Sequence, residues 1–300
     1  MKLSNLLSKD GLYWIAYYTI LATHTDRWVS DRAFLILQYH CICGKPLNLK
    51  NPQSYNEKLQ WLKLYDRKPE YTQMVDKYAV KKYVADRIGE EFIIPTIGVW
   101  DKPEDIEWDL LPKRFVLKCT HDSGGLVICS DKSKLDRKTA MEKLRLSLRR
   151  DYYRASREWP YKNVPRRIIA EEYLESEPGS NDLPDYKFFC FDGEVKFVEL
   201  DYGRFSHHGR NLYTPEWRRV DAVLGVPSIP GVEFERPEGL DIAIGLAKKL
   251  SHGIPHVRVD FFIINGHVFF GELTLYHASG FNKITPESFD KQMGDWISLP

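Results

Sequence analysis

Residues 257–275 read VRVDFFIINGHVFFGELTL, in which two runs of β-branched and aromatic residues are separated by Asn265 and Gly266. Such runs favour β-strands, and an Asn-Gly pair between them is typical of the turn of an antiparallel hairpin. A two-residue turn would pair Ile264 with His267. It would also place Asp260 and Glu272 on opposite faces, because side chains alternate along a strand.

A three-residue loop over residues 264–266, with Gly266 at positive φ, separates polar from apolar side chains better, and we expect it. It pairs Ile263 with His267. One face then carries only core residues: Val257, Val259, Phe261, Ile263, Phe269, Gly271, Leu273 and Leu275. The other face carries Arg258, Asp260, Phe262, Val268, Phe270, Glu272 and Thr274. In this register Arg258 lies opposite Glu272, and Asp260 lies diagonal to it.

The polar face of the hairpin predicts a metal site. Two carboxylates held close together repel each other unless a cation lies between them, and oxygen ligands at this density suit Mg²⁺ shared with a nucleotide phosphate. A cross-strand ion pair between Arg258 and Glu272, with Asp260 at a solvated edge, explains the same residues. The hairpin alone leaves both interpretations open.

The composition is that of an ordinary globular protein. The 300 residues are 43% apolar and 13% aromatic, enough to bury a sizeable core, and 43 basic residues nearly balance 42 acidic ones. No global field therefore favours nucleic acid as a partner. Five cysteines without zinc spacing favour a reducing cytoplasm. The apolar residues 11–22 are too few to span a bilayer; we expect a packed helix, with contact at the inner face of a membrane as the alternative.

Helices and strands alternate after two helices expected within residues 1–45. Ser54 and Glu57 have the spacing of a capping box for a helix that reaches about Tyr65. Asp76 can cap a helix that ends at Gly89, and a strand follows at residues 93–99. This alternation predicts an α/β layer.

Residues 115–129 predict two strands joined by a loop that ends in Ser123, Gly124 and Gly125, with Lys118 on the incoming strand. Paired glycines let backbone N–H groups approach an anion, and the lysine supplies a charge, so this loop is a candidate phosphate cradle. A plain tight turn with a surface lysine is the alternative. Residues 204–211, RFSHHGRN, form a second candidate anion-facing loop, for which the alternative is a solvated hairpin tip.

Four long motifs resemble the TupA-like ATP-grasp family of surface-polysaccharide loci. They are NPQSYNEKLQW at residues 51–61, KCTHDSGG at 118–125, REWPY at 157–161 and FGELT at 270–274. The resemblance runs from about residue 45 to the end. It implies an α/β (α+β) ATP-grasp fold, in which a nucleotide lies between a small capping subdomain and a core antiparallel sheet. The implied divisions are a helical extension at 1–50, an α/β subdomain at 51–111, a capping subdomain at 112–175 and a core subdomain at 176–300.

The resemblance also implies roles for individual residues. Lys77 and Lys118 would hold the nucleotide phosphates under the loop of Ser123, Gly124 and Gly125. Glu171 would accept from the adenine amino group, the backbone near Leu174 would read the ring edge, and Asp185 would contact the ribose. Glu172 and Lys187 complete the implied nucleotide-binding set.

Further implied roles concern the reacting groups. Arg204 or Arg210 and Asn211 would approach the γ-phosphate, Asp260 and Glu272 would bind Mg²⁺, and Arg258 would stabilise the transferring phosphoryl group. Thr274 would be a third metal ligand; most of the superfamily has Asn there, so its shorter reach bears on a second metal. The substrate contacts that we expect are Arg157, His208, Ser279 and Gly280.

The implied reaction is an ATP- and Mg²⁺-dependent ligation through an acyl phosphate. Family context predicts a uronic acid carboxylate of a capsule-like glycan and an amino acid or small amine as the partners. A glycosyltransferase is one alternative, although the sequence has no Asp-x-Asp motif. A nucleotide-binding scaffold without turnover is the other, and Thr274 leaves it open.

Overall fold

The computed structural model describes residues 9–175, 183–203 and 207–300. Its N-terminal part is a pair of helices, α2 (Lys9–Ala22) and α3 (Asp31–Cys43), joined by the 3-10 turn η1 (Thr25–Trp28). Ser30 caps α3 by accepting from the Ala33 N–H, and Gly44 ends it with φ 66°. The two helices expected before residue 45 are confirmed. Among the described residues, no helix has both the length and the apolar character that crossing a membrane requires.

Helix α4 (Tyr55–Tyr65) begins at the capping box of Ser54 and Glu57, as the sequence predicts. After α5 (Glu70–Val75), Asp76 Oδ1 accepts from the N–H groups of Tyr78 and Ala79 at the start of α6 (Ala79–Ile88). Gly89 follows α6 with φ 114°. The capping residues predicted from the sequence therefore mark the start of α4 and both ends of α6.

The first sheet has the strand order β1-β4-β2-β3, and every pair is antiparallel. Its strands are β1 (Thr96–Trp100), β2 (Phe115–Cys119), β3 (Leu126–Cys129) and β4 (Ile168–Glu172). Helix α7 (Arg137–Leu148) packs on β2 and β3 around a small core that includes Phe115 and Leu144. Helix α8 (Tyr152–Ser156) and η5 (Trp159–Asn163) lead from α7 to β4.

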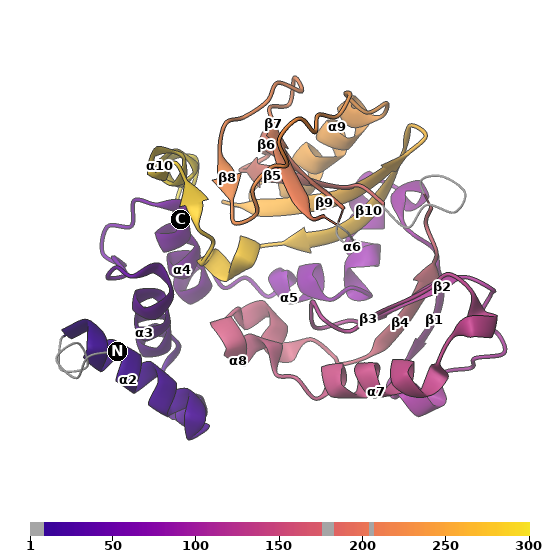
Figure 1. Cartoon of the computed structure of the whole chain (residues 1–300), viewed down its shortest axis with the longest axis horizontal. Helices are drawn as coiled ribbons and strands as arrows, with labels where there is room; N and C mark the ends of the chain where they lie inside the picture. The colour runs from indigo at the N-terminus through magenta and orange to yellow at the C-terminus, as the bar shows by residue number, and fades with distance from the viewer. Residues whose placement is uncertain (1–8, 176–182, 204–206) are drawn as a thin grey trace.

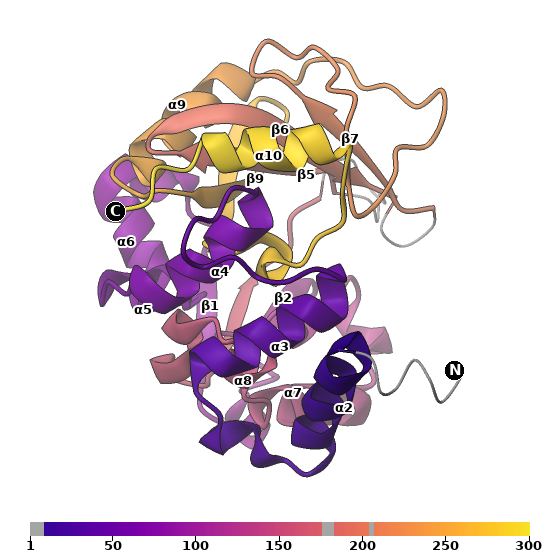
Figure 2. The same cartoon turned by 90° about the vertical axis from the view of Figure 1, so that its left-hand side faces the viewer.

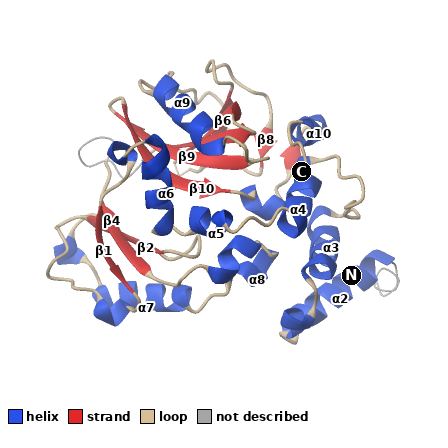
Figure 3. Ribbon diagram, turned by 180° about the vertical axis from the view of Figure 1, so that it is seen from behind, coloured by secondary structure: helices blue, strands red, loops and turns tan. Residues whose placement is uncertain are grey.

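The second sheet has the order β10-β9-β5-β6-β7, also antiparallel throughout. Its strands are β5 (Asp185–Phe191), β6 (Glu194–Tyr202), β7 (Gly209–Tyr213), β9 (Val257–Ile264) and β10 (His267–Thr274). Helix α9 (Leu240–Ser251) covers one face of this sheet, and α6 packs against α9 (Figure 3). Beside it lie the two-stranded sheet of β8 (Val223–Leu224) and β11 (Ile284–Thr285) and the last helix, α10 (Glu287–Asp295).

The two sheets lie on opposite sides of the molecule, with α2 and α3 beside them (Figure 1). The larger core belongs to the five-stranded sheet, where residues such as Phe188, Val259 and Phe261 are fully buried. Its other face is turned toward the four-stranded sheet. This arrangement leaves a polar layer between two apolar cores.

The β9–β10 hairpin differs from the expected register. The turn has two residues, with Asn265 at φ 50° and Gly266 at φ 79°, and Ile264 pairs with His267. The three-residue loop was wrong, although the positive φ of Gly266 is confirmed. A bulge between Phe270 and Glu272 then shifts the register by one residue.

With this turn and bulge, several side chains lie on a different face of the hairpin from the one expected. Before it, Val268 and Phe270 point into the core, each 4% exposed, whereas they were expected on the polar face. After it, Glu272 pairs with Asp260 and Thr274 with Arg258. The carboxylates therefore lie on one face after all, directly opposite each other rather than diagonal.

Candidate active site

A cavity of about 510 Å³ lies between the two sheets. Its charged lining mixes both signs evenly: Lys77, Lys118, Lys187, Arg210 and Arg258 with Asp122, Asp185, Asp201, Asp260 and Glu272. The cations come from both sides of the cavity, while all the acids except Asp122 come from the five-stranded sheet. Such a lining suits a polyanion that is bound together with a metal cation.

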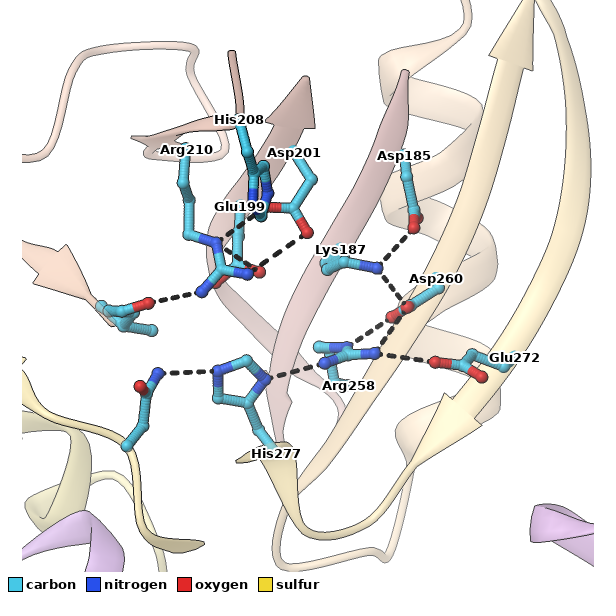
Figure 4. A network of polar contacts seen from close by, with 12 residues as sticks. Asp185, Lys187, Glu199, Asp201, His208, Arg210, Arg258, Asp260, Glu272 and His277 are labelled. Atoms are coloured by element: carbon cyan, nitrogen blue, oxygen red, sulfur yellow. Dashed lines mark hydrogen bonds and ion pairs between the residues drawn. The ribbon is translucent and has the colours of Figure 1, made fainter. Parts of the chain in front are cut away.

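Arg258 is the centre of the network on the five-stranded sheet (Figure 4). Its Nε and Nη2 atoms each lie 2.7 Å from a different oxygen of Asp260, and Nη2 also lies 2.9 Å from Glu272 Oε1. Burial acts to raise the pKa of Glu272, but the charges of Arg258, Lys77 and Lys187 outweigh it and lower the pKa to about 2. Glu272 is therefore ionised at neutral pH.

Lys187, on the neighbouring strand β5, extends this network. Its Nζ atom lies 2.7 Å from Asp260 Oδ2 and 2.5 Å from Asp185 Oδ2. The sequence places Asp185 and Lys187 on one face of β5 because they are two residues apart. The register pairs Lys187 with Asp260, so the side chains of Asp185, Lys187 and Asp260 meet.

The first residue that sequence reasoning did not assign is His277. Its Nδ1 atom accepts from Arg258 Nη1 at 2.7 Å, so the ring proton belongs on Nε2. Burial first, and then the charge of Arg258, keep the pKa of His277 well below its usual value. Asn282 Nδ2 lies 3.1 Å from Nε2; with the ring proton on Nε2, the Asn282 amide is turned so that its oxygen accepts. His277 is thus a neutral group that orients the guanidinium.

A second acid pair was also missed. Glu199 and Asp201 on β6 face Arg210, whose Nε lies 3.1 Å from Glu199 Oε1 and 2.8 Å from Asp201 Oδ1. Burial raises the pKa of Glu199 to about 7 despite the opposing charge of Arg210. The turn at residues 192–193 alone would pair Lys187 with Val198. A register shift between Phe189 and Cys190 brings Lys187 opposite Glu199 instead, and the sequence did not reveal it.

His208 and Arg204 belong to the same stretch of chain. His208 Nε2 lies 3.2 Å from Asp201 Oδ1, and its side chain is 38% exposed. Arg204 lies outside the described residues. Of the expected anion-facing loop, Arg210 therefore lines the cavity and His208 lies at its acid pair.

The opposite wall of the cavity carries the glycine loop. Ser123, Gly124 and Gly125 line the cavity together with Lys77 and Lys118, as the sequence predicts. Lys77 Nζ donates to the Asp122 carbonyl, and the Gly125 N–H donates to Asp122 Oδ1 at 3.0 Å. A Cβ atom on Gly125 would lie 2.3 Å from Ser147 Oγ. Glycine is therefore required here by the packing of α7 against the loop.

Lys118 shares a carboxylate with a second lysine. Its Nζ lies 2.5 Å from Glu171 Oε2, while Lys81 Nζ lies 2.6 Å from Oε1. Burial acts to raise the pKa of Glu171, but the two lysines outweigh it and lower the pKa. Two lysines share one carboxylate, so the group of Lys81, Lys118 and Glu171 carries a net positive charge beside the cavity. Sequence reasoning assigned Glu171 to adenine and did not identify Lys81.

Several expected site residues lie elsewhere. Asn211 is fully buried, and its amide bonds Tyr213 Oη and the Val232 carbonyl, because it points to the opposite face of β7 from Arg210. The expectation of a γ-phosphate contact by Asn211 was wrong. Glu172 is exposed at the end of β4, and neither it nor Leu174 lines the cavity.

Arg157 was expected to contact substrate, and this was also wrong. It is 2% exposed and 4.1 Å above the Phe34 ring, and its Nη2 donates to the Asp26 carbonyl at 2.6 Å. The Asp26 and Asp31 carboxylates lie 3.8 and 3.7 Å from its guanidinium. Arg157 therefore anchors the N-terminal helices.

The loop η6 (His277–Gly280) enters the cavity wall in an unusual conformation, with φ at 46°, 55° and 66° for Ala278, Ser279 and Gly280. Ser279 and Gly280 do not line the cavity, whereas Ala278 does. Buried partners hold the loop. Lys63 Nζ donates to the Ser279 carbonyl at 2.7 Å, and Ser279 Oγ donates to Glu158 Oε1 at 2.5 Å.

The donor set fits Mg²⁺ held jointly with phosphate oxygens. Mg²⁺ is commonly bound by one or two carboxylates plus substrate phosphates and waters, and Asp260 and Glu272 supply two paired carboxylates. The described residues contain no group of three or more acidic, histidine or cysteine ligands, so an all-protein metal cage does not fit. Thr274 Oγ1 lies 3.3 Å from Glu272 Oε1, and Thr274 is not part of the cavity lining.

Comparison with known proteins identifies related sequences and folds. The model of the family described as TupA-like ATPgrasp matches residues 57–298. No curated protein matches in sequence. A D-alanine-D-alanine ligase from Helicobacter pylori aligns at 13% identity and a TM-score of 0.47, over 83% of this chain and 67% of that one.

Two further solved structures align at similar levels. An L-amino acid ligase from Bacillus licheniformis shares 16% identity at a TM-score of 0.44, over 75% of this chain. The chain spans 49% of that ligase, about half its length. The ATP-grasp ligase PsnB, in complex with a phosphomimetic variant of its minimal precursor, Mg and ADP, shares 12% identity at a TM-score of 0.42, over 85% of this chain and 65% of that one.

Proposed function

The chain belongs to the TupA-like ATP-grasp family, and on this premise we propose that it is an ATP-dependent ligase that joins a carboxylate to an amine. The observation that carries the proposal is the pairing of Asp260 with Glu272 across the hairpin. This carboxylate pair faces a cavity whose other wall carries Lys77, Lys118 and the loop at residues 123–125.

The nucleotide would be held from both sheets. Lys77 and Lys118 would supply positive charge for the phosphates, and the backbone of Ser123 and Gly124 would supply N–H donors. Lys81 stays paired with Glu171 when Lys118 turns toward a phosphate, because the two lysines bind different oxygens of that carboxylate. Asp185 and Lys187 lie near enough to Asp260 to contribute to the same pocket.

Asp260 and Glu272 would hold Mg²⁺, which neutralises charge on the transferring phosphoryl group. In the proposed reaction, a substrate carboxylate oxygen attacks the γ-phosphorus and ADP leaves. The amine then attacks the acyl carbon and phosphate leaves. Arg258 and Arg210 supply fixed positive charge for these steps, and His277 and Asp260 hold the Arg258 guanidinium in place.

The proposed substrates follow the family context: a uronic acid of a surface polysaccharide as the carboxylate and an amino acid or small amino alcohol as the amine. The proposed product is an amide, and the enzyme would work without a covalent protein intermediate. Arg210, which lines the cavity, supplies a cation that supports an acidic substrate.

Two measurements test the function. Mg-ATP should raise the melting temperature, UDP-sugars should not, and the rise should be lost in Glu272→Gln but kept in Glu216→Gln, which alters an exposed glutamate. Release of ADP should then depend on both a uronic acid and an amine from a substrate panel. Stabilisation by UDP-sugars alone would favour a glycosyltransferase. Binding of Mg-ATP without any turnover over the panel would favour a scaffold.

A further inference from the structure

Helix α2 has an apolar face that no other described residue covers, within residues 9–175, 183–203 and 207–300. Among residues 11–22 of the helix, for which burial is described, Thr19 is the one exposed residue that is not apolar or aromatic. The large exposed side chains are Leu12 (56%), Trp14 (39%), Ile15 (43%), Tyr18 (52%) and Leu21 (38%). Trp14 and Tyr18 stack on each other, with ring centroids 5.3 Å apart. We call these five residues the α2 face.

The opposite side of α2 is already packed. Tyr17 is buried against Phe34 of α3, its hydroxyl accepts from Gln38 Nε2 at 3.2 Å, and Tyr13 stacks on His40. An ordinary surface helix is polar on the side away from its core, whereas α2 is apolar on both sides. Figures 1 and 2 show α2 at the margin of the molecule, next to α3. Among the described parts of the chain, the α2 face therefore has no partner.

In the segment that follows α2, the acidic side chains are paired with arginines, whereas two other arginines are exposed. Asp26 is turned toward Arg154 and Arg157, and Asp31 is 2.6 Å from Arg67. Arg27 and Arg32, in contrast, are exposed, and Arg27 lies 4.4 Å above the ring of Trp28. Trp28 is itself 71% exposed. The end of α2 that leads into α3 thus presents arginine and tryptophan outward and keeps its acids inward.

These features match the surface of an anionic bilayer. The 14 residues of α2 extend for about 21 Å, which is too short to cross a hydrocarbon core of ~30 Å. Trp and Tyr side chains are favoured at the membrane interface, and basic residues beside an apolar helix face bind anionic headgroups. A second copy of the chain fits less well, since a stable dimer buries ~800 Å² on each partner and a single helix face offers few polar groups for it.

We propose that the α2 face docks on an anionic lipid surface, with α2 lying parallel to the bilayer and Trp28, Arg27 and Arg32 at the headgroups. The inference is independent of the proposed function. It gives α2 and α3 the role of holding the cavity near a membrane. An acceptor presented at that surface would then reach the enzyme without diffusing through bulk water.

Sedimentation of the full chain with vesicles tests the proposal. The protein should bind vesicles made of an equal mixture of phosphatidylcholine and phosphatidylglycerol. It should bind vesicles of phosphatidylcholine alone much more weakly. Trp14→Gln together with Tyr18→Gln should lower the vesicle partition coefficient more than about tenfold, because apolar area is removed from the interface. Arg27→Glu together with Arg32→Glu should abolish the preference for phosphatidylglycerol.

The matched control changes apolar residues that are equally exposed but far from α2. Leu110→Gln with Leu146→Gln alters side chains that are 72% and 51% exposed, and vesicle binding should not change. Equal binding by the α2 variant and this control would overturn the proposal, as would no vesicle binding by the wild type. A dimer detected by light scattering and abolished by the α2 substitutions would assign the face to a second copy instead.

Discussion

Arg258 and Asp260 form a two-point ion pair on one strand, with both N–O distances at 2.7 Å, and the pair is buried at 8% and 2% exposure. A fork of this kind fixes the plane of the guanidinium. Nη1 is then free to reach His277, and the second hydrogen of Nη2 reaches Glu272. The position of the Arg258 charge in the cavity therefore depends on the fork as much as on the charge.

Arg258→Lys should keep the charge but lose the fork. We expect turnover to fall about 10²- to 10³-fold, as when a preorganised donor is removed. Binding of Mg-ATP should change only slightly, because Lys187 still balances Asp260. Calorimetry with Mg-ATP and steady-state ADP release measure the two effects. Arg218→Lys, at an exposed arginine, is the control, and equal turnover in the two variants would contradict the assignment.

Lys118→Ala should weaken nucleotide binding, because it removes a charged phosphate contact of roughly 1.5 to 3 kcal/mol. Lys81→Ala provides the matched comparison: it removes the other partner of Glu171 but is not part of the cavity lining. The Lys81 variant should lose melting temperature and lose less affinity for ATP than the Lys118 variant. An ATP affinity of Lys118→Ala equal to that of the wild type would show that Lys118 makes no phosphate contact.

Gly271→Ala should disturb the bulge that places Glu272 opposite Asp260. The new Cβ would lie 3.1 Å from the Asp260 carbonyl and 3.4 Å from the Phe262 ring. We expect a loss of about 1 to 3 kcal/mol of unfolding free energy, as for other crowded sites, and weaker Mg²⁺-dependent ATP binding. Urea unfolding and calorimetry check this.

The control for the bulge is Gly245→Ala, where a Cβ would have no neighbour within 4 Å and the helix α9 should gain stability. A Gly271 variant as stable as this control would show that the bulge tolerates a side chain.

The buried Lys63 side chain should make the free energy of unfolding depend on pH. Burial, opposed in part by Glu158, lowers the pKa of Lys63 from 10.5 to about 7. Above pH 7 the unfolded chain therefore binds a proton that the folded chain has released, so the free energy of unfolding rises with pH. The rise should be visible up to about pH 8.5, where cysteines begin to titrate.

Lys63→Met should remove this slope, whereas Lys248→Met, at an exposed lysine, should leave it unchanged. Urea unfolding at a series of pH values measures the slope. An identical pH profile in wild type and Lys63→Met would mean that Lys63 is charged throughout this range.

Local signals predicted much of the fold. The capping box at Ser54, the glycine after α6 and the Asn265-Gly266 turn each depend on a few adjacent residues, and all appear in the structure. The loop length of the hairpin was wrong because the polar pattern can be matched either by a longer loop or by a bulge. Gly271 was the residue that distinguished them, since its position permits the bulge.

The site was predictable where it follows one strand and less so where strands meet. Arg258, Asp260 and Lys187 follow from alternation, whereas Glu199 and Asp201 needed the register of β5 with β6. Arg157 was assigned to the substrate because it lies in a motif that carries the family resemblance. Its partners lie about 130 residues earlier in the chain, and no local pattern reveals them.

Arg157 and Glu158 are adjacent, yet each holds a different part of the protein. Arg157 is fixed by Asp26 and Asp31 at the N-terminal helices, and Glu158 accepts from Ser279 beside the cavity. Truncation of the chain before α4 would leave Arg157 as a buried cation without its carboxylates, one peptide bond from the residue that fixes the cavity loop. The smallest fragment that keeps these contacts of Arg157 therefore includes η1 and α3.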